Sequence, residues 1–182
     1  MEELARWRRA HKSPLRLLDV GCGTGSFARM MARTDEFVSV VGLDYSPSMC
    51  KEADAKRGSR GSDGGFDLHF VAGDSEHLPF EDQQFDVVTC ANSFHHYPHQ
   101  LNVIREMKRV LRTGGRLMLL DGFRDNAIGW FVFDVVIGSI EKQVHHAPWS
   151  DIRGYFTEAG FANITQRKTN VLFPAVCTMG DA

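Results

Sequence analysis

Three carboxylates and a glycine-rich turn are the residues of this sequence best suited to hold a small ligand. Asp19 comes just before the turn G-C-G-T-G at 21–25, and Asp44 and Asp74 each follow a short apolar run. A glycine turn at a helix N-terminus offers backbone N–H groups to a ligand, usually a phosphate. Opposite charges 4 Å apart attract by about 4 kcal/mol at an effective dielectric of 20, and like charges repel equally. Three carboxylates therefore disfavour a pyrophosphate and favour a ligand that carries positive charge.

The spacing of the turn glycines points the same way. Gly21, Gly23 and Gly25 form a G-x-G-x-G pattern, whereas the third glycine of the dinucleotide-binding fingerprint lies one position later. The turn therefore differs from a dinucleotide cradle in both spacing and charge. A nicotinamide-dependent oxidoreductase stays as an alternative that rests on the glycine turn alone.

The elements that must position these residues alternate along the chain. Short β-rich runs alternate with longer helical segments, which is typical of a parallel sheet covered by helices. We expect five strands, at 15–20, 37–44, 66–74, 85–92 and 115–122. We expect helices between them, at 26–34, 47–57 and 98–112. Because strand ends in a doubly wound sheet open onto one crevice, the three carboxylates should surround one ligand.

Local signals mark where two of these helices begin and end. Ser46 followed by Pro47 predicts a helix start, because the serine oxygen caps early amides and proline is preset for the first turn. The glycines at 114–115 predict the end of the helix that finishes at Arg112, because glycine tolerates the left-handed cap conformation.

The pattern changes after Gly122. Residues 126–140 are apolar on nearly every helical face, but the run is shorter than the roughly 20 residues needed to cross a bilayer. It predicts a buried or capping helix. Ser150 predicts the cap of a last helix that ends near 160, followed by two closing strands at 162–170 and 172–180.

The composition is that of one soluble domain over residues 1–182, since the chain is 43% hydrophobic and 24% charged. A net charge of -2 gives no positive field for nucleic acid, and the segment 57–65, R-G-S-R-G-S-D-G-G, is interpreted as a flexible loop rather than an RNA-binding one. Residues 1–12 lack an apolar core of signal-peptide length. The four cysteines form no C-x-x-C pair, which favours reduced thiols. Together these observations favour a cytoplasmic protein with no stable membrane insertion.

The ordered motifs give the chain a specific resemblance. They are L-L-D-V-G-C-G-T-G, V-V-G-L-D-Y-S, A-G-D-S-E-H-L-P-F, F-D-V-V-T-C-A-N-S-F-H-H-Y and L-R-T-G-G-R-L-M-L-L-D-G. In this order the chain resembles the class I S-adenosylmethionine-dependent methyltransferases from about Arg16 to Phe161, and most closely the branch that includes ubiquinone and menaquinone biosynthesis methyltransferases. The resemblance implies an α/β fold, a Rossmann-like doubly wound seven-stranded sheet that is mostly parallel with an antiparallel edge strand. It also implies S-adenosylmethionine as cofactor, with S-adenosylhomocysteine as its product.

The resemblance assigns roles near the glycine turn. Gly21, Gly23 and Gly25 would let the backbone approach the methionine part of the cofactor. Asp19 would help to hold its amino group, although satisfaction by nearby backbone amides is the alternative. Asp44 would accept hydrogen bonds from both ribose hydroxyls, because a carboxylate has two acceptor oxygens.

The same resemblance assigns the adenosine side of the site. Tyr45 and Met49 would pack on the sugar and adenine, and Asp74 would take the adenine amino group while the Ser75 amide meets a ring nitrogen. Asn92 would offer its carbonyl beside the cofactor's amino group. The alternative for the two strand-end carboxylates is that they only form turns.

The acceptor side is expected in N-S-F-H-H-Y-P-H, residues 92–99. Methyl transfer from a sulfonium is a direct displacement, so the enzyme mainly aligns the acceptor, and a histidine can serve as base when the acceptor is a hydroxyl. We take His96 as the candidate catalytic residue; the alternative is that His95 and His96 only pack against the following helix. His95 and His99 have a metal-like spacing, but Pro98 interrupts it and no metal is expected.

The segment 123–150 is a candidate lid or acceptor-side insertion. Trp130, Phe131 and Phe133 would favour a small apolar or aromatic acceptor by burial. The alternative is that these rings belong to the core or to a dimer face, so a homodimer stays open.

One departure from the family bears on activity. Only 16 residues precede Leu17, fewer than is usual in the family, so the pocket could be open, completed by a second subunit or lacking a piece. The leading hypothesis is a small-molecule methyltransferase; a non-catalytic S-adenosylmethionine-binding partner or regulator is the alternative. A nucleic-acid or protein methyltransferase is disfavoured, because A-N-S-F-H-H-Y lacks the Asn/Asp-Pro-Pro-aromatic tetrapeptide of adenine and glutamine enzymes.

Overall fold

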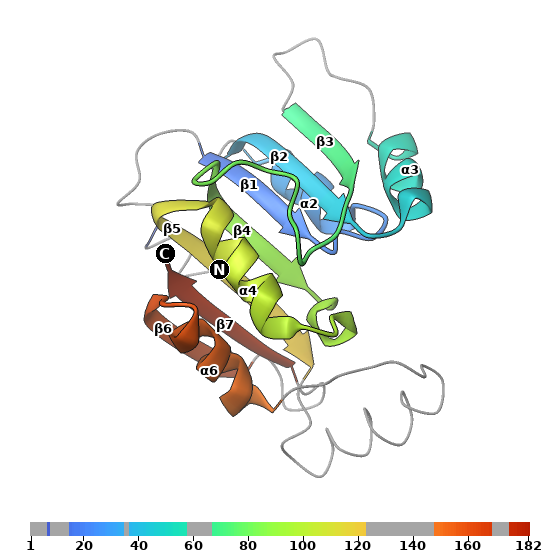
Figure 1. The fold of residues 1–182 in the computed structure, drawn as a ribbon. Helices are drawn as coiled ribbons and strands as arrows, with labels where there is room; N and C mark the ends of the chain where they lie inside the picture. Colours follow the sequence, from blue (N-terminus) through green and yellow to red (C-terminus); the bar gives the residue numbers. More distant parts are fainter. Residues whose placement is uncertain (1–6, 8–14, 35–36, 58–66, 123–147, 169–174) are drawn as a thin grey trace, which may run out of the picture.

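The alternating apolar runs form a single sheet in the computed structural model, which describes residues 7, 15–34, 37–57, 67–122, 148–168 and 175–182 (Figure 1). Within these residues seven strands follow the order β3-β2-β1-β4-β5-β7-β6. Their bounds are β1 Leu15–Val20, β2 Phe37–Asp44, β3 Asp67–Ala72, β4 Phe85–Ala91, β5 Leu111–Gly122, β6 Ala162–Lys168 and β7 Ala175–Asp181. The sheet thus contains the five expected strands and the expected closing pair.

The first five strands are parallel, and β1 lies at the centre. Asp19 of β1 is in register with Gly42 of β2 on one side and with Thr89 of β4 on the other. Strand β7 runs antiparallel to both β5 and β6, so it is the one reversed strand and lies one position inside the edge. The predicted Rossmann-like fold, mostly parallel with an antiparallel pair at one edge, is confirmed. The crossover at β1 and β4 is the position where ligands bind in such sheets.

The helices follow the sequence signals with two exceptions. Their bounds are α2 Ser26–Ala32, α3 Pro47–Ala55, α4 Gln100–Val110 and α6 Trp149–Glu158, with a 3-10 turn η1 at Phe94–His96. The predicted cap of α3 is confirmed, because the Met49 N–H donates to the Ser46 hydroxyl at 3.5 Å.

The predicted end of α4 was wrong by two residues. The helix ends at Val110, because Leu111 is already extended, with φ -77° and ψ 138°, and pairs in β5. Gly114 has φ +77° but lies beyond the helix end.

The predicted cap of α6 was also wrong. Pro148 occupies the N-cap position with φ -52° and ψ 143°, and Ser150 lies inside the first turn, where its hydroxyl donates to Asp151 at 3.3 Å. Proline has its φ fixed near the value that this flank requires, and the helix starts two residues earlier than a cap at Ser150 would place it.

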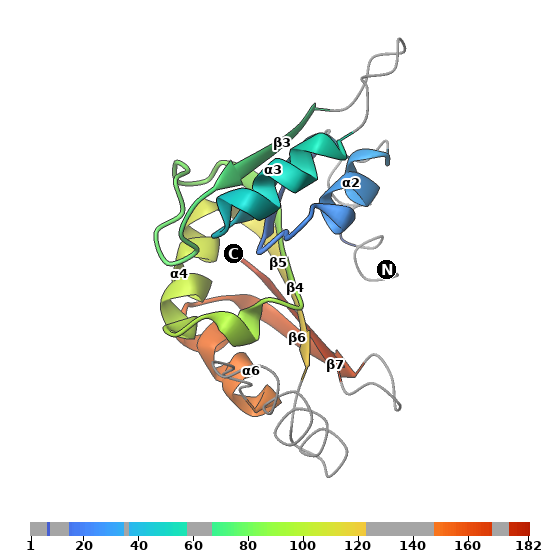
Figure 2. The same ribbon diagram turned by 90° about the vertical axis from the view of Figure 1, so that its right-hand side faces the viewer.

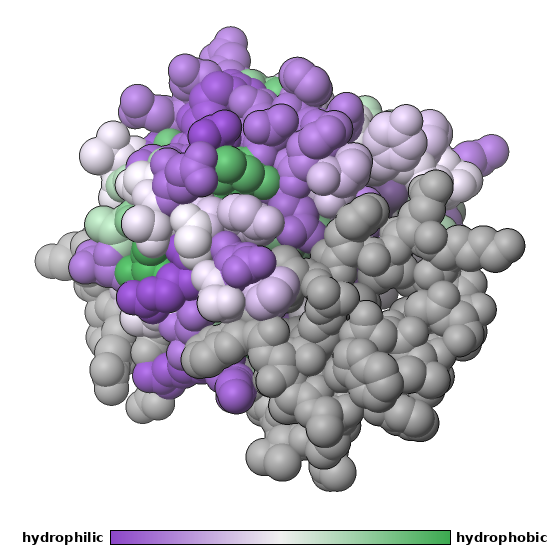
Figure 3. All heavy atoms as spheres, turned by 60° about the horizontal axis from the view of Figure 1, so that its bottom comes forward, coloured by the Kyte–Doolittle hydropathy of each residue, from purple (hydrophilic) through white to green (hydrophobic). Residues whose placement is uncertain are grey.

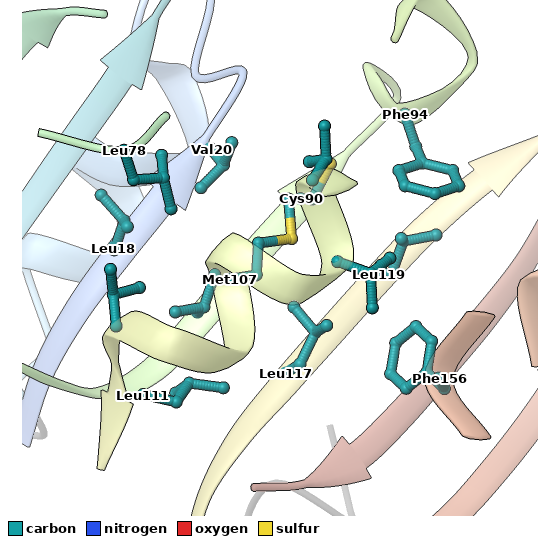
Figure 4. Packing of buried hydrophobic residues seen from close by; sticks show 14 of the residues in the cluster. Leu18, Val20, Leu78, Cys90, Phe94, Met107, Leu111, Leu117, Leu119 and Phe156 are labelled. Atoms are coloured by element: carbon teal, nitrogen blue, oxygen red, sulfur yellow. The ribbon is translucent and has the colours of Figure 1, made fainter. Parts of the chain in front are cut away.

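Buried side chains form one cluster on each face of the sheet. Trp7 and α2 pack on one face, over Leu15 and Leu17. Helices α4 and α6 cover the other face, where Met107 and Phe156 are fully buried against β4, β5 and β7 (Figures 2 and 4). Each such side chain contributes about 1.5–3 kcal/mol by leaving water, so the sheet that carries the strand ends is rigidly held.

The outer surface is mostly polar where the structure describes it. The face in Figure 3 is largely hydrophilic, with small apolar patches among the described residues. Four large apolar side chains stay exposed in the described part of the chain: Met30, Val38, Tyr45 and Met49. Among the helices that the structure describes, none is long and apolar enough to span a membrane.

Candidate active site

The glycine turn is held to β2 by backbone hydrogen bonds. The Leu43 carbonyl accepts from the N–H groups of Gly21 and Cys22, at 2.8 and 2.9 Å. Gly21, Gly23 and Gly25 have φ values of 72°, 53° and 73°, a left-handed conformation that side chains disfavour. The three glycines are therefore required by the backbone itself.

The turn has one open side. A Cβ at Gly21 would overlap the Ser93 side chain and lie 2.7 Å from the Tyr97 hydroxyl, and one at Gly25 would lie 2.5 Å from the Phe70 ring. A Cβ at Gly23 would meet nothing within 4 Å. A ligand can therefore approach the backbone at Gly23, whereas the other two glycines make room for the protein's own side chains.

Asp19 is a buried carboxyl with an unused oxygen. It is only 2% exposed, and the Thr89 hydroxyl donates to its Oδ1 at 2.8 Å. No described residue donates to its Oδ2. Burial raises the pKa of Asp19 to about 7; the Thr89 hydrogen bond opposes that shift and the charge of Asp44 adds to it. A buried acceptor with no donor is costly, so this oxygen fits a cationic donor from a ligand.

Asp44 joins the glycine turn to α3. Its Oδ2 accepts from the Gly23 N–H at 2.8 Å, and its Oδ1 accepts from the Ser46 N–H at 2.9 Å. Each oxygen keeps a second lone pair for a further donor. Tyr45, 78% exposed, and Met49 present apolar surface on the same segment. The residues at 44–49 thus combine acceptors with an exposed apolar surface.

The loop after β3 places Asp74 and Ser75 differently. Asp74 is exposed and its Oδ1 accepts from the Glu76 N–H at 2.9 Å, which is a local turn contact. Ser75, the next residue, is buried. Asp74 therefore stabilises a local turn, which is the role that sequence reasoning gave as the alternative.

The loop after β4 begins with a strained residue. Asn92 has φ 54°, in the left-handed region, and its N–H donates to the Leu120 carbonyl at 2.8 Å. Its side chain is exposed. Such strain outside glycine persists only where the surroundings impose it.

Two hydroxyls and a thiol form a partly buried group that contacts the end of β1, directly before the glycine turn. The Tyr97 hydroxyl donates to Ser93 at 3.3 Å, and the Cys90 sulfur lies 3.2 Å from the same oxygen. Ser93 also bonds to the Val20 carbonyl of β1 at 3.3 Å. Burial raises the pKa of the Cys90 thiol to about 12, so it stays protonated. All three residues lie in the motif F-D-V-V-T-C-A-N-S-F-H-H-Y, but sequence reasoning gave them no role.

The two adjacent histidines lie in different surroundings. His95 is held by Asp121, with its Nδ1 2.7 Å from Oδ1 and its backbone N–H donating to Oδ2 at 2.8 Å. His96 is exposed, and its ring centroid lies 4.2 Å from that of His95. Sequence reasoning missed Asp121, although it lies at the carboxyl end of β5, as Asp44 lies at the carboxyl end of β2.

The candidate lid falls almost wholly outside the described residues. Residues 123–147, with Trp130, Phe131 and Phe133, are not described, and only 148–150 of this segment are. The proposed lid stays a prediction. In the described part of the chain, no group of three metal-ligating side chains is present.

The glycine turn and the strand-end residues lie inside a region that matches a known family. A family profile described as "Methyltransferase domain" matches residues 18–119, more than half of the chain. The chain belongs to this methyltransferase family. The match begins within β1 and ends within β5, so it includes Asp19, Asp44 and Asp74 but not Asp121.

Two curated relatives show what this methyltransferase domain resembles. It is 40% identical over 131 residues to a demethylmenaquinone methyltransferase of Deinococcus radiodurans, covering 69% of this chain and 52% of that protein. It is 38% identical over 129 residues to phthiotriol/phenolphthiotriol dimycocerosates methyltransferase 1 of Mycobacterium ulcerans, covering 71% and 45%. The chain thus spans about half the length of the curated relatives it matches.

A solved structure confirms the fold. The magnesium protoporphyrin IX methyltransferase of Synechocystis, solved with bound SAH, has a TM-score of 0.72 and 21% identity to the chain. The match covers 99% of this chain and 80% of that one. At this identity the likeness shows the shared fold alone.

Proposed function

We propose that the protein binds S-adenosylmethionine at the carboxyl ends of β1, β2 and β3 and transfers its methyl group to a small apolar acceptor. The observation that carries the proposal is the unused oxygen of buried Asp19 beside the open side of the turn at Gly23. An anionic ligand would be repelled there, whereas the ammonium group of the cofactor supplies the missing donor. When bound, S-adenosylmethionine supplies a methyl group activated by a positively charged sulfur.

The glycine turn and the two inner carboxylates would hold the polar part of the cofactor. The turn at 21–25 brings backbone close to the methionine portion, and Asp19 accepts from its ammonium group. Asp44 uses the remaining lone pairs of its two oxygens for the ribose hydroxyls, while its Gly23 and Ser46 hydrogen bonds keep it in place.

The adenine side of the proposed site is formed by residues within 45–49 and by the loops after β3 and β4. Tyr45 and Met49 would lose exposed apolar surface by covering the sugar and adenine. Asp74 would accept from the adenine amino group and the Ser75 N–H would donate to the ring. Asn92 would place its side-chain carbonyl beside the amino group of the cofactor.

The acceptor class follows from the relatives and is itself a proposal. The two named relatives act, by their names, on a demethylmenaquinone and on dimycocerosate lipids, which are apolar molecules. We infer a small, largely apolar acceptor for this chain. We also propose that the protein is cytoplasmic, which is supported by its four cysteines, since none of them forms a disulfide.

Calorimetric titration tests the cofactor assignment. S-adenosylhomocysteine is expected to bind with a 1:1 stoichiometry and NAD is not, because the site offers a buried carboxylate where NAD carries a pyrophosphate. Transfer of a radiolabelled methyl group from S-adenosylmethionine to 1,4-naphthohydroquinone then tests catalysis. Tighter binding of NAD than of S-adenosylhomocysteine would refute the cofactor; cofactor binding without transfer to any apolar acceptor would favour a non-catalytic role.

A further inference from the structure

The buried carboxylate of Asp121 is dedicated to His95. Asp121 is 2% exposed and lies at the carboxyl end of β5. Its Oδ2 accepts from the His95 backbone N–H at 2.8 Å, and its Oδ1 accepts from the Gly122 N–H at 2.7 Å and lies 2.7 Å from His95 Nδ1. Asp121 thus holds both the backbone and the ring of His95.

This arrangement decides which ring nitrogen carries the proton. A carboxylate can only accept hydrogen bonds, so Nδ1 must donate to Asp121. A neutral His95 then bears its proton on Nδ1 and its lone pair on Nε2. A carboxylate behind a histidine also stabilises the imidazolium that forms when Nε2 takes a proton, as in other catalytic pairs of this kind.

The pair lies next to the proposed cofactor site rather than elsewhere on the sheet. His95 belongs to η1, directly after β4, and η1 contacts β5, whose arrowhead lies beside it in Figure 1. Ser93 bonds to the Val20 carbonyl at the start of the glycine turn. The same short segment therefore touches the turn through Ser93 and carries His95 two residues later.

His95 is better placed than its neighbour to move a proton. Its side chain is 14% exposed and is anchored to a buried carboxylate. His96 is exposed, and its ring lies against that of His95 in a tilted arrangement, with the two planes inclined by 50°. The alternative in which both histidines only pack against α4 does not account for a buried carboxylate bonded to one of them.

We propose that His95 is the general base for the methyl acceptor, that Asp121 is its positioning residue, and that the acceptor is a hydroxyl compound rather than an amine. This inference rests on the proposed function. A neutral amine attacks with its own lone pair, whereas a neutral hydroxyl is a weak nucleophile that gains from a base as it attacks. A dedicated carboxylate–histidine pair therefore matches a hydroxyl acceptor.

The step balances without another reactant. The acceptor oxygen forms a bond to the methyl carbon, the carbon–sulfur bond breaks, and its electron pair stays on sulfur. The hydroxyl proton passes to Nε2 of His95. The positive charge of the sulfonium is thus replaced by that of the imidazolium beside Asp121.

The first test needs no acceptor. Long-range nitrogen–proton NMR of the full chain at pH 8, with and without S-adenosylhomocysteine, reports the tautomer of each histidine, and His95→Gln assigns the signals. We expect His95 to carry its proton on Nδ1 in the wild type and to lose this preference in Asp121→Asn. A wild-type His95 protonated on Nε2 would overturn the proposal.

The second test compares two acceptors of the same shape, 1-naphthol and 1-naphthylamine, with radiolabelled S-adenosylmethionine. We expect 1-naphthol to be methylated faster, and His95→Gln to lower kcat by about 10²- to 10⁴-fold, the range for a lost general base. The dissociation constant of S-adenosylhomocysteine should stay within twofold.

The control is another histidine paired with an aspartate. His69 lies 2.5 Å from Asp67 on β3 and is exposed, so His69→Gln removes a similar contact outside the site. It should leave kcat within twofold. Preference for 1-naphthylamine, or a larger loss in His96→Gln than in His95→Gln, would overturn the inference. Absence of S-adenosylhomocysteine binding would instead refute the proposed function.

Discussion

The buried carboxyl of Asp19 makes cofactor binding depend on pH. Its pKa is raised from 3.8 to about 7, mainly by burial, so half of the free protein holds a proton there at neutrality. The ammonium group of S-adenosylhomocysteine is attracted only to the ionised form. Binding must therefore release the proton, and the dissociation constant should be about tenfold larger at pH 6 than at pH 8.

Calorimetry in buffers of different ionisation enthalpy measures this proton directly. With a pKa of about 7, about half a proton per ligand should be released at pH 7 and nearly one at pH 6. Asp19→Asn keeps an acceptor for the Thr89 hydroxyl but has no proton to release, so its weaker binding should not change between pH 6 and pH 8. Equal wild-type affinities at the two pH values, or an unchanged pH dependence in Asp19→Asn, would refute the reasoning.

The same shift fixes the sign of the stability change in the free protein. Because the folded pKa lies above the unfolded one, the folded state holds the extra proton between pH 4 and pH 7, and stability falls as pH rises through this window. The full effect is on the order of 4 kcal/mol. Urea unfolding at pH 5 and pH 8, which spans most of this window, should show a loss of about 3 kcal/mol in the wild type and a smaller one in Asp19→Asn.

Four further changes separate the site from the scaffold. Asp44→Ala should raise the dissociation constant of S-adenosylhomocysteine by about 10- to 150-fold, the equivalent of about 1.5–3 kcal/mol for hydrogen bonds to a charged group; calorimetry that finds no loss contradicts the ribose assignment. Gly23→Ala should cost only about 1–2 kcal/mol of folding free energy, from its left-handed backbone, yet strongly weaken cofactor binding. Gly21→Ala should destabilise more, because its Cβ would overlap Ser93; the reverse order in urea unfolding would contradict the open side of the turn. Phe156→Ala, which truncates a fully buried side chain of α6, should cost about 3–5 kcal/mol while the folded fraction binds the cofactor normally.

Some strands were predicted better than the helix ends. Strand periodicity placed β1 and β2 at their observed bounds, but β5 begins at Leu111, four residues before the predicted 115, and β3 ends at Ala72 rather than at 74. The ligand crevice around Asp19, Asp44 and Asp74 stays a prediction. The end of α4 at Val110 and the start of α6 at Trp149 were missed, because Leu111 already pairs with β4 and Pro148 takes the cap position. Both corrections come from tertiary pairing or backbone restriction that local signals do not contain.

The candidate site also has features that the sequence could predict and features that it could not. The strand-end rule that selected three carboxylates also applies to Asp121, so this residue could have been found from the sequence. Which of two adjacent histidines it holds could not, because that depends on the 3-10 turn η1, a conformation with no distinct signal here. Likewise, the unused oxygen of Asp19 depends on the Thr89 contact from β4.

The double hydrogen bond at the Leu43 carbonyl has a consequence for how binding is driven. This carbonyl holds Gly21 and Cys22, and Asp44 holds Gly23, so the turn is tied to β2 at three consecutive residues without any ligand. The turn is therefore preorganised, and a ligand that docks there does not have to supply the free energy of ordering a loop. We expect the amide protons of Gly21, Cys22 and Gly23 to exchange slowly with solvent in the free protein, and to slow little further on binding.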